Sequence, residues 1–174
     1  YEILFVADEV ICGFGRTGEM WGSQTYNLEP DMISSAKALS AAMQPISALM
    51  INEKVSDAIV KNSGKIGTLG HGYTYMGHPV AAAVALETLN IYEERDIMGH
   101  IDAIAPVMQK RLQSYADHPL VGEVRGVGLV GAVELVKDKA TKEMFDPAGK
   151  VGAYLVDRAK DHGLILRNIA DAIA

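Results

Sequence analysis

Two short apolar stretches decide the fold of this chain: Ile3-Leu4-Phe5-Val6-Ala7-Asp8 and Asp31-Met32-Ile33-Ser34-Ser35-Ala36-Lys37. Each is predicted to form a strand, and the first lacks alternation, which is typical of a strand covered on both faces. The first ends in a carboxylate and the second in an amine. Parallel neighbours in an open α/β sheet finish at one edge, where ligands bind. If the two strands are neighbours, Asp8 and Lys37 face one crevice.

This pair of side chains has a chemical use. A lysine amine can form a Schiff base with an aldehyde. If the aldehyde is pyridoxal phosphate, an acid against the ring nitrogen keeps that nitrogen protonated, and the ring then withdraws electrons from the substrate carbon. The alternative is a solvated lysine at a strand end and an acid in a turn, which is the commoner state of charged residues.

Three segments carry a family resemblance. They are Ala7-Asp8-Glu9-Val10-Ile11-Cys12-Gly13-Phe14-Gly15-Arg16-Thr17-Gly18, then Ala36-Lys37-Ala38-Leu39-Ser40 with Gln44-Pro45-Ile46-Ser47-Ala48, and Gly70-His71-Gly72-Tyr73-Thr74-Tyr75-Met76-Gly77-His78-Pro79-Val80. In this order they resemble the cofactor-ring segment, the Schiff-base lysine segment and the phosphate-contacting loop of the class III aminotransferases. These are pyridoxal-phosphate enzymes of fold type I. The similarity extends over nearly the whole chain and is nearest to the ω-amino acid:pyruvate transaminase branch.

The resemblance implies a set of cofactor-binding residues. Asp8 would bond the pyridine nitrogen, and Val10 would pack on the ring face. Lys37 would be the catalytic residue, holding the cofactor and shuttling a proton. Thr74 would bind the phosphate of the partner subunit's cofactor. Two alternatives stay open, because Val10 also suits a plain core position and Thr74 suits a helix cap.

The resemblance also implies a substrate-binding residue. Arg167 matches the arginine that grips a substrate carboxylate, for which a guanidinium offers a planar bidentate fork. The alternative is a surface arginine beside Asp171. Two departures from the family pattern are Ala38, where glycine is common, and Met76, where a small residue often stands.

Together these features predict a pyridoxal 5'-phosphate-dependent aminotransferase. It would move an amino group from an amine or ω-amino acid to a keto acid such as pyruvate, in a homodimer with shared active sites. An aminomutase or decarboxylase of the same fold uses the same cofactor residues and stays an alternative. So does a non-catalytic fragment that is only a folded or binding unit. The chain looks like a fragment without the N-terminal half, and such a fragment is expected to be inactive alone.

The predicted fold class is α/β. Residues 1–97 are interpreted as the C-terminal half of a cofactor-binding large domain, with a mixed, mostly parallel sheet and helices. Residues 98–116 are interpreted as a linking helix, and residues 117–174 as a truncated small α+β domain. Apolar periodicity predicts helices over 53–61, 79–94, 98–115 and 148–160. Further strands are predicted over 46–51, 121–125, 129–136 and 164–167, and a glycine-rich loop over 64–72.

Composition excludes several other classes of protein. The chain has 174 residues and a net charge of −6, which disfavours nucleic-acid binding and a polybasic membrane anchor. No apolar run is long enough to span a bilayer. A single cysteine, Cys12, permits no internal disulfide and fits a cytoplasmic protein. Two matches to G-x-G-x-x-G, at residues 13–18 and 126–131, lack the strand-to-helix context of a dinucleotide site.

Overall fold

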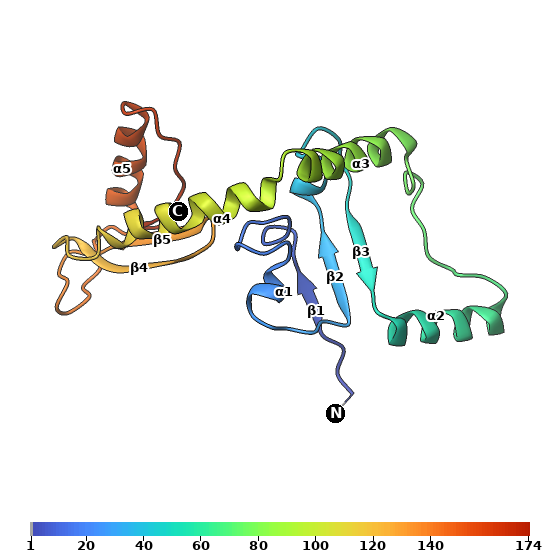
Figure 1. Ribbon diagram of the computed structural model, residues 1–174. Helices are drawn as coiled ribbons and strands as arrows, with labels where there is room; N and C mark the ends of the chain where they lie inside the picture. The colour runs from blue at the N-terminus through green and yellow to red at the C-terminus, as the bar shows by residue number, and fades with distance from the viewer. Residues whose placement is uncertain (1) are drawn as a thin grey trace. The chain divides into compact units, whose positions relative to one another are not determined.

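The computed structural model describes residues 2–174, which form two compact units, Tyr1–His100 and Ile101–Ala174 (Figure 1). The boundary falls inside helix α4 (Ile97–Gln113). Each unit has its own sheet and its own buried apolar cluster. Within the described residues, no helix combines the length and apolar character needed to cross a membrane.

The first unit contains a three-stranded sheet of β1 (Val6–Asp8), β2 (Met32–Ser35) and β3 (Ala48–Ile51). Figure 1 shows β2 between the other two strands, parallel to β1 and antiparallel to β3. The sheet is therefore mixed, with one pairing of each kind. The parallel pairing meets the condition, set in the sequence analysis, that the two strands are neighbours.

The first strand differs from its prediction in length and in burial. It covers three residues, and Val6 is 50% exposed. The prediction of a strand covered on both faces is wrong for this chain, since β1 lies at the sheet edge and the core lies elsewhere. That core joins three residues. Phe14 comes from the segment after β1, Leu39 from the segment after β2, and Ala85 from helix α3 (Pro79–Glu94).

The helices of the first unit follow local signals. Helix α3 has the bounds that Pro79 and the apolar pattern predicted, because proline is favoured in a first helical turn. Helix α2 (Glu53–Ile66) is longer than predicted, and Gly64 lies inside it. The glycine-rich loop therefore begins at Gly67, whose φ of 79° ends the helix. Two short helices, α1 (Gly22–Thr25) and the 3-10 helix η1 (Lys37–Ser40), were not predicted.

The second unit packs one helix on an antiparallel sheet. The strands are β4 (Val121–Val127), β5 (Val130–Leu135), β6 (Asn168–Ile169) and β7 (Ala172–Ile173), in the order β4-β5-β7-β6. Helix α5 (Lys150–Lys160) contributes Val151, Leu155 and Val156 to the core of this unit. The predicted strand over 164–167 is wrong, because pairing with β7 starts at the end of that stretch. Its last residue, Arg167, exchanges two backbone hydrogen bonds with Ala174, of 2.9 and 2.8 Å.

Two glycine patterns lack the structure of a dinucleotide site. Residues 126–131 form the turn and flanking strands of the β4–β5 hairpin. Residues 13–18 form turns that lead to α1, a helix of four residues.

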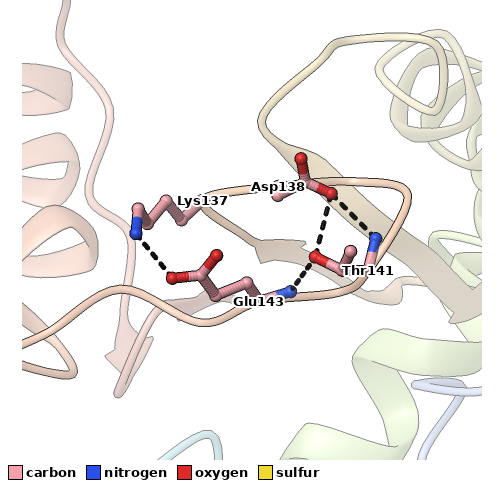
Figure 2. Close-up of polar contacts among 4 residues, drawn as sticks. All are labelled: Lys137, Asp138, Thr141 and Glu143. Carbon is pink, nitrogen blue, oxygen red and sulfur yellow. Dashed lines mark hydrogen bonds and ion pairs between the residues drawn. The ribbon is translucent and has the colours of Figure 1, made fainter.

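The exposed loop after β5 is held by its own polar contacts, in which Lys137 Nζ lies 2.5 Å from Glu143 Oε1 and Asp138 binds Thr141 (Figure 2).

Candidate active site

The sheet brings the predicted carboxylate and amine to one edge. Asp8 is the last residue of β1, and its register partner on β2 is Ser34. Lys37 follows three residues after Ser34 and opens η1. Because β1 and β2 are parallel, both strands end on the same side of the sheet. Asp8 and Lys37 thus lie beyond the carboxyl ends of adjacent strands, where α/β sheets bind ligands.

The backbone that carries Lys37 is strained. Lys37 has a φ of 45°, and Ala41 and Ala42 have φ values of 48° and 62°. For a residue with a Cβ, this left-handed region costs about 1–2 kcal/mol. Such strain is often found where a side chain must be presented to a ligand. The Lys37 side chain is exposed, and the described residues form no ion pair with it.

The carboxylate of Asp8 is oriented by two donors that share one oxygen. The Val10 N–H donates to Oδ1 at 3.1 Å, and the Ser34 hydroxyl donates to the same atom at 3.2 Å. No hydrogen bond to Oδ2 is formed within the described part of the chain. Asp8 is exposed, and Val10 beside it is half-buried. The second carboxylate oxygen is therefore available to a donor on a ligand.

Glu9 anchors this edge from the buried side, and the sequence analysis missed it. Its side chain is 3% exposed and accepts hydrogen bonds from the Gly22 N–H at 2.8 Å and the Ser23 N–H at 2.6 Å. Its own N–H donates to the Ser34 carbonyl at 2.9 Å. Hydrogen bonds to a charged group contribute about 1.5–3 kcal/mol each. Glu9 thus ties the end of β1 to both β2 and α1.

The glycine-rich turn after β1 is a packing element. Phe14 is buried, with its ring 5.0 Å from that of Trp21 and 6.3 Å from that of Tyr92. The Tyr92 hydroxyl donates to the Phe14 carbonyl at 3.0 Å, and burial raises the pKa of Tyr92. A Cβ on Gly13 would lie 2.8 Å from the Glu9 carbonyl oxygen, so only glycine fits there. This packing holds α3 against the turn beside Asp8.

The structure does not bring Thr74 to this edge. Thr74 lies in an exposed turn before α3, and no hydrogen bond within the described residues links it to Asp8 or Lys37. The helix cap is His78, whose Nδ1 accepts from the Ala81 N–H at 3.5 Å. The interpretation of Thr74 as the cap is therefore wrong, because the histidine stands nearer the first turn.

Arg167 belongs to the second unit and is exposed. The alternative of a surface arginine beside Asp171 agrees with this exposure, but Arg167 forms no ion pair with Asp171 in the part of the chain that the structure describes. Asp171 is fully buried, and its two carboxylate oxygens accept the Gly149 and Gly152 N–H groups at 2.8 Å each. The Arg167 guanidinium forms no ion pair with any carboxylate that the structure describes. It is therefore free to bind an anion.

The donor set at the sheet edge fits pyridoxal phosphate. A primary amine and an oriented carboxylate project from adjacent strand ends, and the carboxylate keeps one oxygen unused. An aldehyde needs the first group, and a protonated ring nitrogen needs the second. The fold is α/β, and this pair of groups at the carboxyl ends of its strands suits a ligand with a carbonyl group.

Comparisons with known proteins agree with this fold class. The model of the family "Aminotransferase class-III" matches residues 1–174, so the chain belongs to the class III aminotransferase family. Gamma aminobutyrate transaminase 3, chloroplastic, of Solanum lycopersicum is 48% identical over 173 residues, which are 99% of this chain and 33% of that protein. Vanillin aminotransferase of Capsicum annuum is 44% identical, with 99% and 38% covered. The chain thus spans about a third of the length of the curated relatives that it matches.

Solved structures show the same fold. A transaminase with L-alanine superimposes with a TM-score of 0.96 and 53% identity, covering 99% of this chain and 41% of that one. The omega transaminase from Pseudomonas jessenii in complex with PMP gives a TM-score of 0.94 and 50% identity, with 99% and 38% covered. The predicted family, the predicted similarity to ω-transaminases and the predicted fold type I are therefore confirmed.

Proposed function

We propose that the whole protein is a pyridoxal-phosphate-dependent aminotransferase that moves an amino group from an amine or ω-amino acid to a keto acid such as pyruvate. The observation that carries this proposal is the parallel β1–β2 pairing, which presents Asp8 and Lys37 at one edge. Membership of the class III family supports it. Relatives named as gamma aminobutyrate and omega transaminases support the choice of amino donor.

The chain's own residues then have distinct tasks. Pyridoxal phosphate, when bound, supplies an electron sink for the substrate carbon. Lys37 Nζ would hold the cofactor covalently and would carry a proton to and from the substrate carbon. The Asp8 carboxylate would keep the ring nitrogen protonated, because a negative charge favours the protonated form. Val10 would pack against the ring, and Thr74 would bind the phosphate of the partner subunit's cofactor.

Arg167 is proposed to bind the substrate carboxylate. A guanidinium presents paired N–H donors that match the two oxygens of a carboxylate. The residue stays charged at any physiological pH. It would therefore select keto acids such as pyruvate over neutral carbonyl compounds, and it would also hold the carboxylate of an ω-amino acid donor.

The assembly and location follow from the same proposal. A homodimer would share its two active sites through Thr74, with residues 1–97 in the cofactor-binding domain, 98–116 in a linking helix and 117–174 in the small domain. A cytoplasmic location is proposed from the single cysteine. The relatives include proteins named chloroplastic and mitochondrial.

Labelling of the full-length protein tests the proposal. Borohydride reduction after addition of pyridoxal phosphate should attach the cofactor to Lys37, and peptide mass mapping would find it there. Lys37→Ala should abolish both the label and most of the turnover. Lys54→Ala is the matched control, because Lys54 lies on α2 and away from the sheet edge. A label that maps to another lysine would refute the assignment. Product analysis with candidate amines would separate an aminotransferase from an aminomutase or a decarboxylase.

A further inference from the structure

The two hydrogen bonds to Asp8 come from different kinds of donor, one from the backbone and one from a side chain. The Val10 N–H belongs to the backbone and cannot be deleted without disturbing the chain. The Ser34 hydroxyl belongs to a side chain and can be removed alone. Ser34 is the register partner of Asp8, and paired residues of adjacent strands project from the same face of a sheet. The contact between the two side chains, 3.2 Å, is thus a direct product of the strand register.

We infer that Ser34 is a positioning residue for the cofactor, acting through Asp8; the inference rests on the proposed function. The terminal torsion of an aspartate is broad and nearly two-fold, so a carboxylate with one donor can exchange its two oxygens. Two donors on Oδ1 fix the group and direct Oδ2 to the ligand. Ser34 therefore strengthens the contact between Oδ2 and the protonated ring nitrogen.

The backbone of Ser34 is held independently of its hydroxyl. Its carbonyl oxygen accepts the Glu9 N–H at 2.9 Å, and Glu9 is itself anchored by two buried hydrogen bonds. On its other side, β2 pairs Ser34 with Leu49 of β3. Removing the hydroxyl should therefore leave the strand in place. An effect of Ser34→Ala on the cofactor would then report on the hydroxyl rather than on the fold.

Ser35 provides a matched control on the same strand. Successive residues of a strand point to opposite faces. Ser35 is 1% exposed, and its hydroxyl donates to the Ala48 carbonyl at 3.4 Å rather than to Asp8. Ser35→Ala deletes the same atom one residue away and in a more buried position. A general weakening of the sheet would thus be at least as severe in Ser35→Ala as in Ser34→Ala.

The experiment uses the full-length protein with Ser34→Ala, Ser34→Thr, Ser35→Ala and, as the reference for loss of the carboxylate, Asp8→Asn. The dissociation constant of pyridoxal phosphate is measured by absorbance titration of the apoprotein. The protonation of the ring nitrogen is followed against pH by NMR with ¹⁵N-labelled cofactor, and apoprotein melting reports on the fold. Ser34→Ala should weaken cofactor binding about 3- to 10-fold, the range for one hydrogen bond. Its ring nitrogen should lose the proton at lower pH than in the wild type.

The other variants complete the test. Ser34→Thr keeps a hydroxyl that can donate to Asp8, so its dissociation constant for the cofactor should stay within about twofold of the wild type. Ser35→Ala should match the wild type in dissociation constant and ring-nitrogen titration, even if its apoprotein melts earlier. The inference is overturned if Ser34→Ala matches Ser35→Ala in both cofactor measurements while Asp8→Asn weakens binding. If the wild type does not bind pyridoxal phosphate at all, the proposed function falls and the inference falls with it.

Discussion

Asp171 should control the stability of helix α5. Its carboxylate is fully buried and supplies the acceptors that the helix start lacks, since Gly149 at the N-cap has no side chain. The Gly149 N–H donates to Oδ2 and the Gly152 N–H to Oδ1, each at 2.8 Å. The chain around Ala170 also packs closely on the helix start, because a Cβ on Gly152 would clash with the Ala170 carbonyl oxygen. The helix is therefore capped by a residue that follows it in the chain.

Asp171→Asn keeps the shape and removes the charge. The amide offers one acceptor oxygen, and its NH₂ group faces one of the two glycine N–H groups. One charge-assisted hydrogen bond is lost and one buried donor is left unsatisfied, so we expect a cost of about 2–4 kcal/mol. Because about 1.4 kcal/mol corresponds to a factor of ten, local opening should become roughly 30-fold to several hundred-fold more frequent.

Hydrogen–deuterium exchange measures this opening directly. In Asp171→Asn of the full-length protein, the amides at the start of α5 should exchange faster by that factor, because local opening exposes them. Asp138→Asn is the matched control. Asp138 also accepts a backbone N–H, from Thr141 at 2.8 Å, and this hydrogen bond lowers the pKa of its carboxyl (Figure 2). Water can replace that contact because Asp138 is exposed. Equal exchange in α5 for both variants would refute the capping role.

Two further predictions concern the proposed active site. Arg167→Ala should weaken the binding of keto acids such as pyruvate by on the order of 2–5 kcal/mol once the substrate excludes water, and the binding of amines without a carboxylate much less. Steady-state kinetics against an Arg158→Ala control would show this, and equal losses for both substrate types would remove Arg167 from the site. The Lys37→Ala and Thr74→Glu variants of the full-length protein should each be inactive alone. When they are unfolded and refolded together, roughly a quarter of the active sites should regain activity, because at a two-fold interface each subunit supplies the same residues to the other's site. Mixed dimers that are confirmed by mass and stay inactive would contradict a shared site.

Several features of the fold were readable from local sequence. Pro79 and the apolar period after it predicted α3 with its observed bounds. The apolar stretches that end at Asp8 and Lys37 predicted two strands, while their parallel pairing became known only from the structure. These predictions succeed because a helix start, a strand and a turn depend on residues only a few positions apart. The family resemblance likewise rested on continuous segments of sequence, and the family model matches residues 1–174.

Other features depended on tertiary contacts. Glu9 binds amides 13 and 14 residues away, and Asp171 binds amides 22 and 19 residues away. No periodicity marks either residue, since each acts on backbone groups that become neighbours only after folding. The exposure of Val6 likewise depends on what covers the sheet, which the strand's own residues do not encode. The sequence by itself determined most of the longer helices and strands, the family and the residues offered for chemistry. The tertiary structure decided which carboxylates are buried and which face a ligand, because burial is a property of the contacts around a residue and not of the residue.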